Sequence, residues 1–458
     1  MITRSYHFFR TAISESKSIL SLAIPVMLGQ VGHMMFGLAD NLMVGRLGAE
    51  NLAAASIANG IFFTIQVIGM GLTFSLSPIT SAVLGSGKPE KSGDVLLQGL
   101  IVTVPFSLII SLLIILASQN LDVLQQAPEV TRLAKSYLII IGVSVIPLML
   151  FQTYRQFIEG LGFTRPGMAI IWSAILINVF GNYCLIYGKM GFPELGLNGA
   201  GWATLSSRIF MMVVLIVFVH RSSVFKKFNI HFHSIQPDWI QIRHILKIGL
   251  SSGLQYWFET TAFVTAAVII GWIGAEELAA HQVAMSMASI TYMAATGVSA
   301  AASIRTGFYF GQKDRKMIRF TGFQCVALVA VFMTTMGILF IMFRTILPTF
   351  YIENQHVVEV ASGLLIIAAI FQISDGVQVV GLGILRGLQD SKFPTFLTFF
   401  SYWIIGLPIG YLLGFTFGYG VYGVWLGLLF GLTASAILLT LRFNYVSKEL
   451  PEKYENVK

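Results

Sequence analysis

The stretch "GRLGAENLAA" at residues 45–54 returns 226 positions later as "GWIGAEELAA" at residues 271–280, with seven of the ten positions identical. A second match pairs "EGLG" at residues 159–162 with "RGLQ" at residues 386–389, at an offset of 227. The two offsets agree to within one residue, so the similarity extends well beyond a single short motif. The sequence therefore predicts a fold built from two similar halves.

The composition around these repeats is that of a membrane protein. Of the 458 residues, 55% are hydrophobic and 11% are charged, whereas a soluble globular protein carries about 25% charged residues. Apolar runs of 18 or more residues recur along the chain, and each is long enough to cross a bilayer as a helix. The alternating segments of about ten residues that are typical of a β-barrel do not occur in the sequence. An all-α membrane protein is predicted, with twelve spans near residues 19–44, 52–82, 94–118, 133–158, 166–187, 197–219, 244–273, 278–309, 317–343, 357–385, 394–416 and 421–443.

Basic residues in the loops predict the orientation of these spans. If the N-terminus lies inside, 22 of the 29 Lys and Arg residues fall in inner segments and five fall in outer segments. The positive-inside rule then places both termini in the cytoplasm. This loop distribution also explains the net charge of +8 without a nucleic-acid partner.

The repeat and the longest linker predict two lobes of six helices each. The expected boundaries are residues 1–221 for the first lobe, 222–243 for a cytoplasmic linker and 244–458 for the second lobe. Equivalent spans are six apart, an even number, so both lobes face the same way and are related by a pseudo-two-fold axis along the membrane normal. In transporters such a repeat places the substrate path between the halves. A lobe pair that completes its own path needs no second copy, so a monomer is expected.

Three carboxylates interrupt the apolar spans. Asp40 lies near the outer end of the first span, Glu259 midway along the seventh and Asp375 two-thirds along the tenth. A carboxylate within a membrane span costs roughly 2.5–3.5 kcal/mol on insertion scales, and such residues are usually functional. A purely structural pairing inside the bundle is the alternative. At the repeat offsets the three acids align with Ala266, His33 and Leu148, so each belongs to one half only, as site residues would.

Two amides in the fifth span have a spacing that suits a binding site. Asn178 and Asn182 are four residues apart and therefore share one face of a helix. Their carbonyl oxygens are ligands that suit a hard cation, and their amides can also hydrogen-bond a protonated carboxyl. Hydrogen bonding between neighbouring helices explains the pair equally well. Gln282 is interpreted on sequence grounds as a helix-packing or pore-lining residue.

Several long motifs resemble the multidrug and toxic compound extrusion (MATE) transporters, in particular their NorM-type branch. The resemblance covers nearly the whole chain. It rests on "ADNLMVGRLG" in the first span, "LINVFGNYCLIYGKMGFPELGLNGAGWAT" across the fifth and sixth, "FETTAFVTAAVIIGWIGAEELAAHQVA" across the seventh and eighth, and "FQISDGVQVVGLGILRGLQDSKFP" through the tenth. It implies two six-helix lobes around a central cleft, a location in the bacterial inner membrane and antibiotic resistance by multidrug efflux.

The resemblance also implies roles for particular residues. The expected activity is export of cationic, aromatic drugs in exchange for inward Na⁺ or H⁺, with membrane lipids as the surroundings and no cofactor beyond the coupling ion. The chain departs from many NorM-type relatives at Phe371, where they carry Tyr, which weakens the case for a Na⁺ site in the second lobe. The residues matched to the family's cation-coupling and substrate positions are Asp40, Asn178, Asn182, Thr204, Glu259, Gln282 and Asp375, and the Na⁺ candidates among them are Glu259, Asp375, Asp40, Asn178 and Asn182.

Two other functions remain open from the sequence. A flippase of lipid-linked substrates from the same superfamily is one, although the mainly acidic in-span charges favour a cationic substrate. A membrane-embedded enzyme is the other, but the chain has no HExxH or GxSxG motif to support hydrolase chemistry, and the absence of a P-loop argues against direct ATP coupling.

Overall fold

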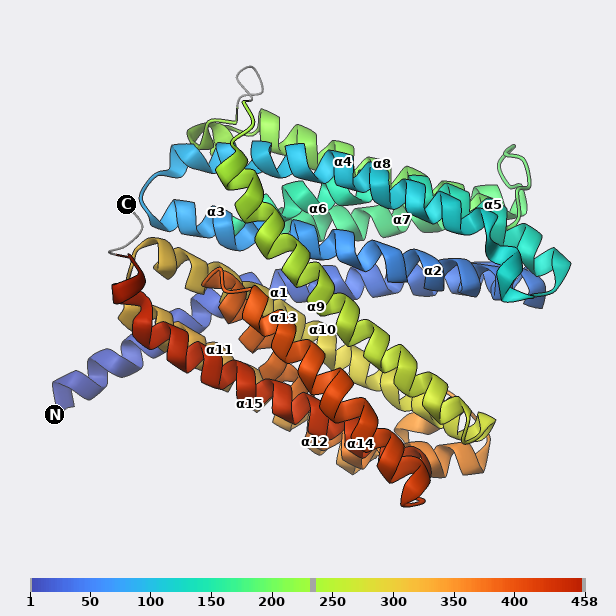
Figure 1. Cartoon of the computed structure of the whole chain (residues 1–458). Helices are drawn as coiled ribbons and strands as arrows, with labels where there is room; N and C mark the ends of the chain where they lie inside the picture. Colours follow the sequence, from blue (N-terminus) through green and yellow to red (C-terminus); the bar gives the residue numbers. More distant parts are fainter. Residues whose placement is uncertain (1, 231–235, 455–458) are drawn as a thin grey trace. The chain divides into compact units, whose positions relative to one another are not determined.

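A computed structural model of the chain describes residues 2–230 and 236–454 (Figure 1). The described residues contain helices and turns and no β-strand. Within them, eleven helical segments are long and apolar enough to cross a membrane. The remaining predicted span, at residues 244–273, falls in α9 (Trp239–Gly271), whose 33 residues exceed the roughly 20 that a bilayer requires. The predicted all-α class with long apolar helices is confirmed.

The helices form two compact units, each with its own hydrophobic clusters. The first span of the chain is α1 (Ile2–Gly45). The unit of residues 28–253 contains the end of α1, α2 (Ala49–Thr73), α3 (Leu76–Gly85), α4 (Ser92–Gln119), α5 (Pro128–Val143), α6 (Val145–Gly160), α7 (Arg165–Tyr187), α8 (Leu197–Arg221) and the start of α9. The second span runs through α2 and α3, and the fourth through α5 and α6.

The other unit combines residues 1–27 with residues 254–458. It contains the start of α1, the end of α9, α10 (Ala275–Gly311), α11 (Arg315–Phe343), α12 (Gln355–Gly387), α13 (Lys392–Phe399), α14 (Leu407–Tyr411) and α15 (Gly420–Tyr454). The π-helical segment Phe400–Gly406 joins α13 to α14, and a second one, Leu412–Thr416, extends α14, so that all four form one continuous span. We refer to this unit as the C-terminal unit and to the first as the N-terminal unit.

The units do not divide the chain at the linker. The chain passes from the C-terminal unit to the N-terminal unit inside α1, between Met27 and Leu28. It returns to the C-terminal unit inside α9, between Gly253 and Leu254. These two points are 226 residues apart, which is the offset of the sequence repeat. Pro25 lies inside α1 two residues before the change, where a proline removes one backbone hydrogen bond. The lobe boundaries predicted from sequence stay a prediction, and residues 231–235 of the predicted linker lie outside the described part.

A buried carboxylate holds the start of α1 to the rest of the C-terminal unit. Glu15 is 4% exposed. It accepts hydrogen bonds from Arg305 (2.9 and 2.5 Å), from the Tyr309 hydroxyl (3.0 Å) and from the Thr321 hydroxyl (2.9 Å). A buried carboxylate with four donors on α10 and α11 explains why this helix segment packs with residues far along the chain.

Glycines at equivalent positions allow close helix packing at both points where the chain changes from one unit to the other. A Cβ on Gly71 of α2 would overlap the Gly253 backbone of α9, and a Cβ on Gly297 of α10 would lie 2.7 Å from the Ala23 carbonyl oxygen and 2.9 Å from Met27 Cβ in α1. The offset of 226 takes Gly71 to Gly297 and Met27 to Gly253. The repeat found in sequence is therefore also a repeat of packing, and it depends on small residues at the closest approach of the helices.

Replacing Gly297 by Ala is expected to lower the thermal stability of the purified protein, since overpacking of a well-packed position costs roughly 1–3 kcal/mol. Gly60→Ala is the matched control, because nothing lies within 4 Å of a Cβ at that helical position and Ala is the better helix former. Melting curves in detergent would contradict the packing if Gly297→Ala melted at or above the wild-type temperature.

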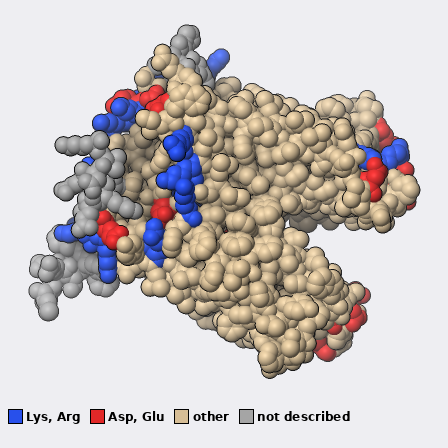
Figure 2. Space-filling model, viewed as in Figure 1, with Lys and Arg blue, Asp and Glu red and all other residues tan. Residues whose placement is uncertain are grey.

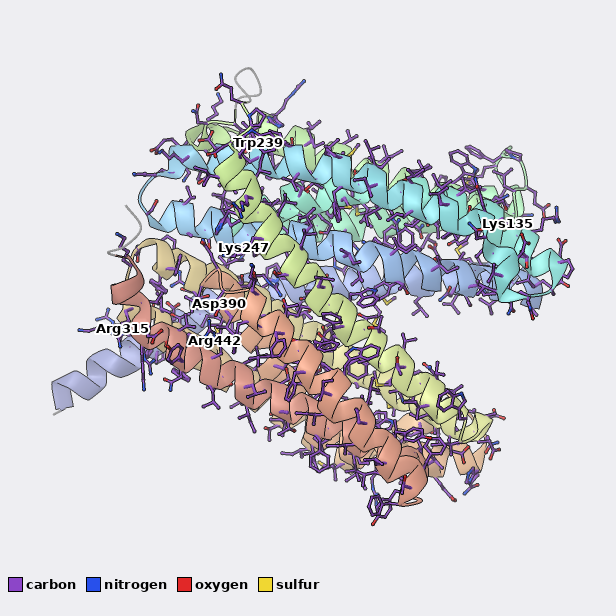
Figure 3. The ribbon with its side chains drawn as sticks, in the orientation of Figure 1. Lys135, Trp239, Lys247, Arg315, Asp390 and Arg442 are labelled. Atoms are coloured by element: carbon purple, nitrogen blue, oxygen red, sulfur yellow. The ribbon has the colours of Figure 1, made fainter. Side chains whose placement is uncertain are left out.

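Charged residues gather toward the helix ends, and long uncharged faces lie between them (Figure 2). In the N-terminal unit, Lys135 of α5 lies at the opposite end from Trp239 at the start of α9 (Figure 3). In the C-terminal unit, Arg315, Asp390 and Arg442 lie toward one end, where Arg442 Nε donates to Asp390 at 2.8 Å (Figure 3). Each unit thus has an apolar middle bounded by charged ends, as a bilayer requires.

Candidate cation sites in the two units

The end of α1 brings Asp40 into a hydrogen-bonded cluster of the N-terminal unit. The side chain is 9% exposed. Asn182 Nδ2 donates to Asp40 Oδ1 at 2.6 Å, and the Thr204 hydroxyl donates to Asp40 Oδ2 at 3.0 Å. Both donors come from helices distant in sequence, α7 and α8, which share an extensive contact. The structure therefore places Asp40 beside residues that the sequence analysis matched to the same site.

The two amides of α7 complete this cluster. Asn178 and Asn182 are both fully buried, and Asn182 Nδ2 also donates to Asn178 Oδ1 at 3.2 Å. Asn178 Nδ2 in turn lies 3.4 Å from the Thr204 hydroxyl oxygen. The helical spacing of four residues thus puts both amides on the face that meets Asp40. We call Asp40, Asn178, Asn182 and Thr204 the N-terminal cluster.

One oxygen of the N-terminal cluster has no partner. Asn182 Oδ1 is buried and accepts no hydrogen bond from the part of the chain that the structure describes. A buried acceptor that stays unsatisfied costs about 1–3 kcal/mol, so its position beside a carboxylate calls for a further donor or a cation. A proton on Asp40 and a bound metal cation are both chemically suited to satisfy oxygens in such a cluster.

Arg208 of α8 is the functional candidate that the sequence analysis did not single out. It donates to the Ser144 hydroxyl at 2.6 Å and lies over the Phe62 ring at 4.8 Å, and its charge acts on Asp40. The signal was present in the sequence, because an arginine inside an apolar span is as unusual as an acid there. Arg208 therefore adds a positive charge to the surroundings of Asp40 in the N-terminal unit.

The C-terminal unit holds the other two carboxylates. Glu259 of α9 is 5% exposed and Asp375 of α12 is 6% exposed. Tyr292, Asp375 and Arg386 all interact electrostatically with Glu259. Helices α10 and α12, which carry Tyr292 and Asp375, pack along each other in the same unit. Because the two carboxylates interact electrostatically, we call Glu259 and Asp375 the second cluster, and a cation bound there would offset the repulsion between them when both are ionised.

Aromatic and amide groups are also buried in the C-terminal unit. The Tyr402 hydroxyl donates to Gln378 Oε1 at 2.9 Å, and both side chains are fully buried. Phe371 is buried, with its ring edge-on to Trp425 at a centroid distance of 5.4 Å. Phe371 therefore makes an apolar contact and offers no hydroxyl for cation binding.

The contacts of Gln282 do not place this residue in either cluster. Its side chain is exposed on α10, and its backbone carbonyl accepts from the Ser286 hydroxyl at 2.8 Å. The neighbouring His281 is buried and accepts from Trp425 Nε1 at 3.1 Å, which is a packing role. The functional role matched to Gln282 stays a prediction.

The residue types in the two clusters limit the metals that they suit. No group of three His, Cys, Asp or Glu side chains that could hold a metal ion occurs within residues 2–230 and 236–454. The N-terminal cluster instead combines one carboxylate with amide and hydroxyl oxygens. Oxygen ligands of this kind suit hard cations rather than Zn²⁺ or copper.

Comparisons with known proteins agree with this fold and its repeat. The MatE family model matches the chain twice, at residues 25–184 and 252–412. The chain is 34% identical to the multidrug resistance protein MdtK of Yersinia pseudotuberculosis over 446 residues, which cover 95% of this chain and 97% of the relative. It is 33% identical to MdtK of Proteus mirabilis over 450 residues, which cover 96% of this chain and 97% of the relative. The crystal structure of the eukaryotic MATE transporter AtDTX14 superposes with a TM-score of 0.86 at 20% identity and covers 96% of this chain and 99% of that chain.

The chain therefore belongs to the multidrug and toxic compound extrusion family. It is a multi-pass membrane transporter and not an enzyme.

Proposed function

We propose that the chain is a secondary active antiporter that exports organic cations in exchange for Na⁺ or H⁺ moving inward. The observation that carries this proposal is the N-terminal cluster, where a buried carboxylate lies beside a buried amide oxygen without a partner. A carboxylate in a dry environment attracts any cation that reaches it, because the low dielectric strengthens the interaction. The names of the MdtK relatives support multidrug substrates.

The proposed mechanism is competition for the negative charge of Asp40. An aromatic drug cation is held by the ionised carboxylate, and Na⁺ or H⁺ arriving from outside neutralises that charge and releases the drug. Coupling requires that each ligand bind the inward-facing and outward-facing states with different affinity. The membrane potential contributes about 2.3 kcal/mol per charge for every 100 mV.

Both clusters are suited to binding the coupling ion. In the N-terminal cluster the candidate Na⁺ ligands are the oxygens of Asp40, Asn178 and Asn182, and in the C-terminal unit they are Glu259 and Asp375. Thr204 positions the Asp40 carboxylate through its hydroxyl hydrogen bond. We propose that both termini lie in the cytoplasm, on the basis of the loop charges. We further propose a monomer in the bacterial inner membrane, since two repeated lobes complete a path without a second copy and the MdtK relatives are bacterial proteins.

Ethidium transport by purified protein in liposomes tests this function directly. An inward Na⁺ gradient and an inward proton gradient are imposed separately, and ethidium movement is followed by fluorescence. At least one gradient is expected to drive ethidium against its own gradient, and dissipating that gradient should stop it. The proposal would be contradicted if neither gradient drove ethidium transport, or if the protein moved a lipid-linked anionic substrate instead.

A further inference from the structure

The C-terminal unit also has a groove whose lining includes no residue of either carboxylate cluster. It has a volume of about 450 Å³, within the usual range for ligand sites. Gln324 of α11 holds one side in place by donating to the Ala12 carbonyl at 2.6 Å and to the Ser16 hydroxyl at 2.5 Å, both on α1. The groove is open to the outside and mostly apolar, and its lining residues are Ala12, Arg319, Phe320, Phe323 and Gln324.

Arg319 gives this groove a positive charge that no carboxylate balances among the described residues. Its Nη1 donates to the Asn444 carbonyl (3.2 Å) and the Ser447 hydroxyl (2.7 Å), and its Nη2 donates to Asn444 Oδ1 (2.9 Å). All of these partners are neutral. By contrast, Arg305 pairs with Glu15 and Arg442 pairs with Asp390 in the same unit. Three of the five guanidinium donors of Arg319 are used, so others are available to an anion.

The depth of the groove in a bilayer follows from the length of α11. Its 29 residues span about 43 Å, which equals the thickness of a bilayer with its headgroup layers. The first turn, which carries exposed Arg315 and Lys316, therefore lies among the headgroups. Phe323, eight residues on and 38% exposed, lies about 12 Å deeper along the helix, where acyl chains begin.

The surroundings of Arg319 are strongly basic. The segment "KDRKMIR" at residues 313–319 carries four basic residues and one acid, Asp314. The Asp314 carboxylate caps α11 by accepting from the Met317 backbone N–H at 3.0 Å. Arg315, Lys316, Arg319 and Phe323 follow one another along the same side of α11, since they lie within about 100° of each other at 100° per residue.

We propose that this groove binds an anionic phospholipid of the cytoplasmic leaflet. The phosphate is held by Arg319 with Lys316 and Arg315 near it, and one acyl chain lies along Phe320 and Phe323. Basic pockets between membrane helices on the cytoplasmic side recognise headgroups in this way. The charge selects an anionic lipid over a zwitterionic one, because a zwitterionic headgroup brings no net charge to balance the guanidinium.

Native mass spectrometry of the purified full-length protein tests the proposal. The protein is incubated with equal amounts of phosphatidylglycerol and phosphatidylcholine, and the retained lipids are counted. Phosphatidylglycerol is expected to be retained preferentially by the wild type, and Arg319→Gln should reduce that preference about tenfold, the effect of losing a charge-assisted hydrogen bond. Excess inorganic phosphate should leave the retention unchanged, because it offers no acyl chain for the groove.

Two further variants keep the outcome decisive. Ala12→Phe fills the groove without changing any charge, so it should lower retention even if Arg319→Gln fails to fold. Lys88→Gln, which removes an exposed basic residue from another predicted cytoplasmic loop, should leave retention unchanged. Equal retention of the two lipids by the wild type, or unchanged phosphatidylglycerol retention in folded Arg319→Gln and Ala12→Phe proteins, would overturn the proposal. Neither result depends on drug transport.

Discussion

Replacing Asp40 by Asn is expected to reduce drug export to the level of vesicles without protein, while the protein remains folded. The substitution removes the negative charge that is proposed to hold both the drug and the coupling ion. Losing one member of a buried charge pair costs roughly 2–5 kcal/mol, so drug affinity should fall by at least about 30-fold.

The fold should tolerate this change because the neighbours of Asp40 can adapt. Asn has the shape of Asp, and the Thr204 hydroxyl, which donates to the carboxylate at 3.0 Å, is also able to accept a hydrogen bond from an amide. Asp122→Asn is the matched control, since it removes a carboxylate from the same unit whose side chain is 70% exposed and paired with Lys135. Full drug resistance in cells that express Asp40→Asn at the wild-type level would refute this role.

The second large effect is expected at the acids of the C-terminal unit. If Glu259 and Asp375 bind the coupling ion, Na⁺ should stimulate efflux at fixed pH, and Glu259→Gln or Asp375→Asn should weaken the apparent affinity for Na⁺ by about tenfold or more, the effect of losing one charged ligand. The two carboxylates act on each other within the same unit, so the double variant should lose less than the product of the single effects.

The control for this experiment is an exposed acid of the same unit. Glu276→Gln at the start of α10 removes a carboxylate that is 53% exposed and lies 3.7 Å from His356, and it should leave the Na⁺ response unchanged. Efflux that is independent of Na⁺ and driven by a pH gradient would instead assign the proton as the coupling ion. In that case the same two variants should flatten the pH dependence of efflux.

Most of the fold could be predicted from the sequence, because a bilayer imposes long apolar helices and the repeat was well preserved. The division of α1 and α9 between the two units could not be predicted from the sequence. It depends on close contacts such as Gly297 with Ala23 and Met27 and on the hydrogen bonds of Glu15. Glycine and a single acid near a helix end have many possible roles in a sequence, and only tertiary contacts distinguish them.

Most members of the N-terminal cluster could be predicted from residue spacing and family resemblance. Asn178 and Asn182 share a helix face by their spacing, but only the structure joins them to Asp40 and Thr204 from two other helices. Arg208 could also have been found from the sequence, because the same desolvation cost applies to a basic residue in a span as to an acid. The unsatisfied oxygen of Asn182 is a property of three-dimensional packing, which no sequence pattern reveals.

Equilibrium binding of ethidium to the purified protein tests the central claim most directly. Ethidium fluorescence is measured while Na⁺ is raised at fixed pH, and again while the pH is lowered without Na⁺, for the wild type and for Asp40→Asn. Competition for one carboxylate predicts that at least one of the two ions displaces ethidium from the wild type, and that Asp40→Asn binds ethidium weakly and without dependence on either ion. The account would be contradicted if ethidium binding to the wild type changed with neither Na⁺ nor pH, or if Asp40→Asn bound ethidium as tightly as the wild type.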